Sequence, residues 1–594
     1  MSLVNVGIQL AQSGKKVLLV DMDLEAPGLP TFEILNHHNN HLGVVDYIDS
    51  YVWNGEAPDV KDYIYKTKAK FDSSGEIWVM PVGLQDANYS RKLNSIDWKR
   101  LYEQQSGYLF FEDLKAQWKE TVAPDYVLID SRTGHSDVEG ICTRQLPDSV
   151  AILFFPNDQN LIGLTRIVDG IRNENSRETL VNLHFAVSNV PDLDDEHQIL
   201  CNTLNKFQST LKYKELSAVI HHYNSLSLLK QEVFSLTRPN SKLAKEYSLL
   251  TNSIRSKNIK DREAVLEFLS NATRDLSKVI EDVGPQELSD KIERYKKTYE
   301  QDGEILFNLG ILQNQLGNQI DALSLLSSSF VEQQFPNGKM YALRSQLNYK
   351  FGNKDAVYKD LESMLDSKSI DIESLLETSH ILEIIAPNLQ QRLPKSNAFK
   401  SLSFEDKVFF VLQQDGDEMQ LKVILEILND LRQENDEHKG THSNFLKHEL
   451  ALTNIALGNF KEAQSYLVSD SGDISTNRLS DSFNYAMALW GEKKEPNIGH
   501  FEIVKEQSLE FPEEVKRKDL NFSQCMAITY AVIGEMDEAW SYLNNAISKV
   551  EELSWRIFSA WTYTKVSKEE MREHLLELSN QLENGKIEPR FIHN

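Results

Sequence analysis

Two short acidic clusters hold the residues best suited to chemistry in this chain of 594 residues. Asp21 and Asp23 lie at the end of the apolar run 16–22, and Asp130 ends the apolar run 125–130. Such short runs, rich in Val, Ile and Leu, predict buried parallel strands. In an open parallel sheet, ligands bind beyond the carboxyl ends of the strands. Carboxylates that meet there suit a hydrated Mg²⁺ bridging to phosphates, although Asp also commonly caps a helix or a turn.

The first half of the chain contains the elements that would position these carboxylates. Longer helical patterns, such as residues 97–120 and 161–173, alternate with short apolar runs. The runs are 16–22, 76–82, 125–130, 150–156, 184–190 and 218–223. Strand and helix in alternation predict an α/β domain with a doubly wound parallel sheet.

Three segments of this domain resemble the ParA/MinD-type ATPases, which carry a deviant Walker A motif. They read GKKVLLVDMDLEAPGL, DYVLIDSRTG and LPDSVAILFFPNDQNLIGLTRIVDGI, in the order that the family has them. The second segment resembles the family's Walker B strand. The resemblance covers roughly residues 1–255 and implies a P-loop NTPase-like fold that uses ATP and Mg²⁺.

The family pattern implies a role for each acidic residue. Asp21 would hold a water molecule on Mg²⁺, and Asp130 would bind Mg²⁺ through water as the Walker B carboxylate. Asp23 would be the catalytic residue that orients the water attacking the γ-phosphate. This is the logic of phosphoryl transfer, in which the protein positions the phosphates, neutralises their charge with a metal and orients a water.

The resemblance also implies nucleotide contacts outside the acidic clusters. Asn189 would recognise the adenine, with Pro191 packed beside the base, and Arg132 would contact phosphate or a partner protomer. From the residues alone, a turn residue after a strand is the lesser alternative for Asn189, whereas Arg132 is equally well a surface residue in a turn.

The phosphate-binding loop of the family is missing from the sequence. It reads roughly KGGxGK[ST] and precedes the first helix, yet here a helical pattern begins at residue 2, and no G-x-x-x-x-G-K-[ST] occurs elsewhere. Aligning Asn5 with the Asn of the family's helix places the loop before Met1. Either the chain is truncated upstream of its first residue, which the abrupt start favours, or the loop is absent and the domain is an inactive pseudo-ATPase.

From about residue 300 the chain is helical and self-similar. The clearest unit is LFNLGILQNQLGNQIDALSLL, residues 306–326, and similar units place helix-ending glycines at Gly317, Gly352, Gly458 and Gly534. In three units an Ala follows the Gly by five positions, so that two helices can approach closely. This spacing resembles the tetratricopeptide repeat, whose period is about 34 residues. An all-α repeat solenoid with a concave, partner-binding face is expected, and a generic helical bundle is the alternative.

These patterns divide the chain into three parts. Residues 1–260 form the predicted ATPase domain, residues 261–295 a helical linker, and residues 296–594 the repeat region, whose repeats blur between 366 and 440. Gly284-Pro285 interrupts the helical pattern of the linker.

Composition excludes several classes of protein. The net charge of −26 makes nucleic acid an unfavourable partner, although the basic stretch 206–260 leaves a weak case for DNA. The three cysteines have no zinc-ligand spacing, and the adjacent pairs His37-His38 and His221-His222 suit core or surface positions better than a metal site. No apolar run is long enough to span a bilayer and no signal peptide is evident, so we expect a cytoplasmic protein.

The sequence therefore supports two hypotheses on function. In the first, the N-terminal domain is a Mg-dependent ATPase whose nucleotide state controls how the repeats engage a protein or peptide partner, with dimerisation across the nucleotide as a possibility. In the second, the domain is a catalytically inactive pseudo-ATPase, and the repeats serve as an interaction scaffold. Whether the chain is an enzyme stays open, because as given it lacks the phosphate loop.

Overall fold

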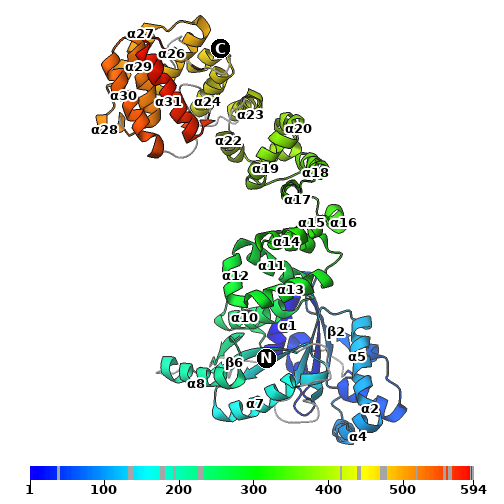
Figure 1. The fold of residues 1–594 in the computed structure, drawn as a ribbon. Helices are drawn as coiled ribbons and strands as arrows, with labels where there is room; N and C mark the ends of the chain where they lie inside the picture. The colour runs from blue at the N-terminus through cyan, green and yellow to red at the C-terminus, as the bar shows by residue number, and fades with distance from the viewer. Residues whose placement is uncertain are drawn as a thin grey trace. The chain divides into compact units, whose positions relative to one another are not determined.

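In the computed structural model, the chain forms two compact units, Met1–Thr298 and Tyr299–Asn594 (Figure 1). It describes residues 1–36, 41–131, 140–173, 181–191, 196–223, 232–414, 418–437, 443–468, 478–516, 518–552, 557–558, 565–588 and 590. No helix in these ranges is long and apolar enough to cross a lipid bilayer.

The first unit is built on strands from each of the six predicted apolar runs and one short strand besides. They are β1 (Lys16–Met22), β2 (Tyr65–Lys66), β3 (Glu76–Met80), β4 (Tyr126–Ser131), β5 (Ser149–Phe154), β6 (Asn182–Val190) and β7 (Ala218–His221). The first four form a sheet in the order β2-β3-β1-β4, and the last three form a sheet in the order β5-β6-β7. All pairs are parallel except β2 with β3, so the predicted parallel arrangement is confirmed.

The split between β4 and β5 differs from the single sheet that the pattern predicted. Within the described ranges, β4 pairs only with β1, and β5 pairs only with β6. Strand β1 is almost fully buried, but the apolar residues 127–129 of β4 are half-buried, and Ala151 and Leu153 of β5 are exposed. Both strands thus have an edge without the neighbour that a buried parallel strand usually has.

Helices cover both faces of the first sheet. Val17 and Leu19 of β1 pack in one core with α1 (Ser2–Gln12) and α10 (Lys242–Lys257), which also contacts β6 and β7. Leu18 and Val20, which alternate with them along β1, pack in a second core with α2 (Val44–Asn54) and α5 (Gly107–Thr121). The sheet is therefore doubly wound, as predicted.

The remaining elements of this unit are short helices and the helices that cover β5–β7. They are η1 (Leu29–Thr31), η2 (Glu33–Leu35), η3 (Val60–Tyr63), α3 (Tyr89–Ser95), α4 (Trp98–Gln104), the π-helical turn η4 (Ile141–Gln145), α7 (Asp158–Arg172), α8 (Glu196–Leu211) and α9 (Phe234–Thr237). The helical pattern over 97–120 is two helices, α4 and α5, because Ser106 takes a left-handed backbone with φ of 53° between them.

Residues 261–295, predicted as a linker, form α11 (Arg262–Arg274), α12 (Leu276–Val283) and most of α13 (Pro285–Thr298) within the first unit. Asp261, which caps α11, is buried and accepts hydrogen bonds from Tyr126 Oη (2.7 Å) and Arg255 Nε (3.0 Å), and Lys15 lies 3.0 Å away. Burial by itself would raise the pKa of the Asp261 carboxyl, but hydrogen bonds from Arg255, Tyr126 and Lys15 lower it below the ordinary value. This cluster ties α11 to the amino ends of β1 and β4.

In its described ranges, the regular secondary structure of the second unit is helical apart from the two-residue strands β8 (Ile557–Phe558) and β9 (Lys565–Val566). Its helices are α14 (Gly303–Gln315), α15 (Gln319–Leu326), α16 (Ser329–Gln334), α17 (Gly338–Lys350), α18 (Lys354–Asp366), α19 (Ile372–Ile385), α20 (Pro387–Arg392), η6 (Leu393–Lys395), α21 (Asn397–Lys400), α22 (Phe404–Gln413), α23 (Glu418–Glu437), α24 (Ser443–Ala456), α25 (Phe460–Leu467), α26 (Leu479–Lys493), α27 (Ile498–Ser508), α28 (Glu513–Lys516), α29 (Leu520–Val532), α30 (Met536–Lys549), η7 (Val550–Glu552) and α31 (Lys568–Glu583).

The four glycines predicted to end helices do so. Gly317, Gly352, Gly458 and Gly534 follow α14, α17, α24 and α29 by two residues, with φ between 75° and 87°. Small residues also bring the paired helices together: a Cβ built on Gly310 of α14 would lie 2.8 Å from Leu326 Cγ of α15. Helical hairpins are thus confirmed at four places, whereas their membership of the tetratricopeptide class stays a prediction.

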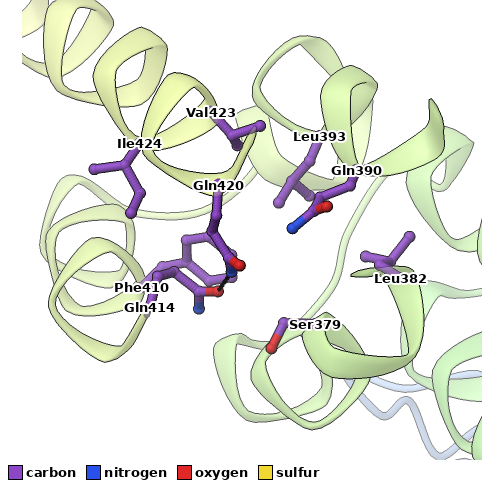
Figure 2. A pocket seen from close by; sticks show the side chains of 9 residues that line it. All are labelled: Ser379, Leu382, Gln390, Leu393, Phe410, Gln414, Gln420, Val423 and Ile424. Atoms are coloured by element: carbon purple, nitrogen blue, oxygen red, sulfur yellow. Dashed lines mark hydrogen bonds between the residues drawn. The ribbon is translucent and has the colours of Figure 1, made fainter. Parts of the chain in front are cut away.

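A small pocket lies where the repeat pattern blurs, among α19, α20, α22 and α23 (Figure 2). The space in which the centre of a water molecule can lie is about 10 Å³, which is room for about one water molecule. Gln390 lines it and is buried, and its Oε1 accepts no hydrogen bond from the described residues. The pocket is therefore far too small for a nucleotide or a partner's side chain.

Candidate functional site

Strands β1 and β4 are neighbours, and their register places Asp21 directly opposite Asp130. The two carboxylates lie opposite each other because β1 and β4 are parallel and end at the same level of the sheet. Met22 and Ser131 form the next pair, after which both strands end. The two acidic clusters therefore share the carboxyl edge of one sheet.

Asp21 is fully buried and ties down the loop that follows β1. Its Oδ1 accepts a hydrogen bond from the backbone N–H of Asp23, and its Oδ2 accepts one from the N–H of Leu29, both at 3.3 Å. Burial raises the pKa of the Asp21 carboxyl to about 7, and the charge of Asp130 adds to the effect. Both ends of the loop 23–29 are therefore held by hydrogen bonds to the Asp21 carboxylate.

Asp23 and Asp130 complete a cluster of like charges. Burial raises the pKa of Asp130, and the charge of Asp23 raises it further. Asp23 is partly exposed, but its Oδ1 is buried and has no hydrogen-bond partner among the described residues. Three carboxyl groups at one place repel one another, so a cation there would lower the free energy of the charged state.

The first turn of α1 lies beside Asp130. Burial lowers the pKa of the Met1 α-amino group, and the charge of Asp130 opposes this. Asn5 and Gln9 hold the helix in place: Asn5 Oδ1 accepts from Ser235 N at 2.9 Å, and Gln9 Nε2 donates to Ala244 O at 2.8 Å. A helix N-terminus carries partial positive charge and attracts anions, so it complements the acidic edge.

A second layer of contacts was not predicted from the sequence. Tyr89 Oη donates to the carbonyl of Leu24 at 2.6 Å. Asp46 is buried and accepts from the N–H groups of Gly43 (3.1 Å) and Leu84 (2.9 Å) and from Lys92 Nζ (2.6 Å). The available signal was the Gly43–Asp46 spacing, which is that of an acidic cap at the third position of a helix.

The predicted adenine contacts lie in the other sheet. Asn189 is an exposed residue of β6 with a left-handed backbone, φ of 58°, where the pairing with β7 shifts register between Val187 and Val190. Its Oδ1 lies 2.7 Å from His222 Nδ1, and Pro191 follows the strand. No hydrogen bond between described residues joins Asn189 or Pro191 to Asp21, Asp23 or Asp130, and Arg132 lies outside the described residues.

The described side chains suit a hydrated cation better than direct chelation. They contain no group of three His, Cys, Asp or Glu side chains arranged to hold a metal directly. His221 Nδ1 lies 2.8 Å from Glu246 Oε1, a pair that occupies both groups, whereas His37-His38 lies outside the described residues. Mg²⁺ commonly keeps several waters and touches few carboxylates, which fits the arrangement of Asp21, Asp23 and Asp130.

Comparisons with known proteins give partial likenesses only. No protein-family model matches the chain, and no curated protein matches it. Among solved structures, it is similar to the MinD cell division protein of Aquifex aeolicus, with 20% identity over 43% of this chain and 91% of that one and a TM-score of 0.31. It is also similar to a ParA family ATPase of Chlorobium tepidum TLS, with 14% identity over 42% and 91% and a TM-score of 0.29. Because these identities and TM-scores are low, the two likenesses carry no argument about function, and any function must be inferred from the site itself.

Proposed function

We propose that the first unit binds a magnesium nucleotide, with ATP as the nucleotide, at the carboxyl edge of β1 and β4. The observation that carries the proposal is the register that sets Asp21 opposite Asp130, with a buried oxygen of Asp23 beside them that has no hydrogen-bond partner in the described part of the chain. Parallel α/β sheets bind ligands at this edge, and the neighbouring end of α1 suits a phosphate group.

The residues present fit a hydrated Mg²⁺ ion. The pKa of Asp21, raised to about 7 by burial and by Asp130, means that the charged cluster is unfavourable without a counter-ion. When bound, Mg²⁺ would supply charge neutralisation to the phosphates and to the carboxylates. Asp21 and Asp130 would hold its waters, and the free oxygen of Asp23 would accept a hydrogen bond from a water near the terminal phosphate. Asn189 and Pro191 would contact the base.

We further propose that the second unit engages a protein or peptide partner and that nucleotide state controls this contact. Support comes from its repeated helical hairpins, α14–α15, α17–α18, α24–α25 and α29–α30, each closed by a left-handed glycine. Stacked hairpins of this kind suit extended binding surfaces, as tetratricopeptide-like solenoids do. ATP hydrolysis would reset the switch.

Equilibrium titration of the full chain with ATP tests the nucleotide site. We expect binding that needs Mg²⁺ and that weakens about tenfold or more in Asp21→Asn and in Asp130→Asn, because each removes a charge that the ion needs. Asp125→Asn is the matched control, since this exposed carboxylate lies at the opposite end of β4, where it accepts from Lys16 N at 2.7 Å. Equal weakening in all three variants, or ATP binding without Mg²⁺, would overturn the proposed site.

A second function is favoured by one observation, which is that the 594 residues contain no G-x-x-x-x-G-K-[ST] motif. In this alternative the first unit is an inactive pseudo-ATPase, and the protein is an interaction scaffold built on its helical hairpins. The same titration separates the two, because the scaffold predicts no measurable binding of ATP at millimolar concentration in the presence of Mg²⁺.

A further inference from the structure

Three hydrogen bonds between described residues fix the two ends of the loop that carries Asp23. Two are the hydrogen bonds from the N–H groups of Asp23 and Leu29 to the Asp21 carboxylate. The third is the hydrogen bond of 2.6 Å from Tyr89 Oη to the carbonyl of Leu24, the residue that follows Asp23. A cation that drew the Asp21 oxygens to itself would weaken the first two attachments, but not the third.

Tyr89 is itself held rigidly. It begins α3, and Lys92 on the next turn of that helix bonds Asp46 at 2.6 Å. Asp46 also accepts the N–H groups of Gly43 and Leu84, which belong to the start of α2 and to the loop after β3. The helix α3 is thus joined through Lys92 and Asp46 to the start of α2 and to the loop after β3, so Tyr89 sits on a helix that has contacts outside the loop it holds.

The hydroxyl of Tyr89 stays a donor over the whole useful pH range. Burial raises its pKa well above the ordinary value, and the charges of Asp21, Asp46 and Asp23 raise it further. Because the charges of Asp21 and Asp23 act on it, the hydroxyl lies close to the acidic edge. A neutral donor placed there can hold the loop without neutralising the carboxylates that a cation would need.

We infer that Tyr89 is a positioning residue of the acidic edge: its hydroxyl bond to the Leu24 carbonyl keeps Asp23 beside Asp130. The inference deepens the proposed function and rests on it only for the identity of the ligand. It predicts that removing the Tyr89 hydroxyl loosens the loop 23–29 after β1 and weakens cation binding there, although Tyr89 itself touches no ligand.

The test compares Tyr89→Phe with Tyr102→Phe in the full chain. Tyr102 is a matched control, because it is also partly buried and its hydroxyl donates to Gln145 Oε1 at 2.7 Å, away from the loop. Without any ligand, we expect amide hydrogen exchange in residues 23–29 to rise by roughly three- to tenfold in Tyr89→Phe, as for loss of one hydrogen bond, and not to change in Tyr102→Phe.

A second readout excludes a merely structural effect. In the presence of ATP, the Mn²⁺ concentration needed for half-maximal binding should rise in Tyr89→Phe and not in Tyr102→Phe, even where both lower the melting temperature equally. Unchanged exchange in residues 23–29 of Tyr89→Phe, or the same rise in both variants, would overturn the inference. If the unmodified chain binds neither ATP nor Mn²⁺, the proposed function fails, and the exchange measurement still decides the role of Tyr89.

Discussion

At the scale of single residues, the acidic edge combines features that stability alone does not require. Asp21 is fully buried beside Asp130, and its pKa is raised to about 7. Buried carboxylates are usually paired with a cation or with several donors, but among the described residues Asp21 accepts hydrogen bonds from two backbone N–H groups, both at 3.3 Å. Strongly shifted groups cluster at functional sites, so this edge is the part of the first unit most suited to a ligand.

Asp21 gives the stability of the first unit a definite pH dependence. Its carboxyl has a pKa of about 7 when folded, against about 4 in an unfolded chain. Between these values the folded state holds a proton that the unfolded state lacks, so the contribution of Asp21 to the free energy of unfolding falls as the pH rises from about 4 to about 7. Above this window the loss is complete and constant, on the order of 4 kcal/mol.

Asp21→Asn should therefore gain stability relative to the unmodified chain as the pH rises. We expect the difference in melting temperature between variant and unmodified chain to be clearly more positive at pH 8 than at pH 5, measured without added metal. Asp125→Asn serves as the control, with a difference that hardly changes with pH. A constant difference for Asp21→Asn would show that Asp21 is not buried in its charged form.

At the scale of elements, local signals explain how much the sequence could predict. Apolar runs bounded by Asp, Pro or Gly predicted six strands, and the glycines predicted the helix ends, because both features depend on a few neighbouring residues. Three features were not predictable in this way: the break at Ser106 between α4 and α5, the two-residue strand β2, and the edges of β4 and β5 that pair with no described strand. They depend on which segments meet in space.

The candidate site, too, could be predicted from the sequence only in part. Asp21, Asp23 and Asp130 could be predicted to share one edge, since they lie at or just after the carboxyl ends of two parallel strands. The contacts of Tyr89 and Lys92 could not, because they join a short helix to a loop and to a helix start, and the sequence signals only the Asp46 cap of α2. Contacts of this kind follow from the folded arrangement of the loops after β1 and β3.

A buried ionic cluster in the second unit gives a prediction at this scale. Arg344 of α17 donates to Asp360 of α18 at 2.6 and 3.0 Å and to Glu332 of α16 at 2.7 Å. The side chains of Arg344 and Asp360 are only 7% and 3% exposed. Arg344→Met should lower the free energy of unfolding of this unit by about 3–5 kcal/mol, because it leaves the buried Asp360 carboxylate without its cationic partner and with a neutral donor, Asn348 Nδ2 at 3.0 Å.

Two further variants test this explanation by denaturant unfolding. Arg392→Met removes an exposed arginine beside Glu362 and Asp366 and should cost at most about 1 kcal/mol. Adding Asp360→Asn to Arg344→Met should recover part of the loss, because the stranded charge is then absent. A loss in Arg344→Met no greater than that in Arg392→Met would contradict the account.

At the scale of the whole molecule, the chain joins an α/β unit to a helical unit of similar size. The first has an acidic edge at the ends of β1 and β4, and the second has repeated hairpins and a cavity of about 10 Å³. This division places the proposed chemistry in Met1–Thr298 and the proposed partner contact in Tyr299–Asn594. The central claim is that a divalent cation and ATP bind together at the acidic edge.

Iron-directed cleavage of the full chain tests that claim most directly. Fe²⁺ in place of Mg²⁺, with ATP, ascorbate and peroxide, generates radicals that cut the backbone next to the bound ion. We predict cuts near residues 21–23 and 130–131, which need ATP, disappear with excess Mg²⁺ and are lost in Asp130→Asn. Cuts elsewhere in a chain that binds ATP, or cuts at these sites that persist without ATP, would contradict a nucleotide-linked cation at this edge.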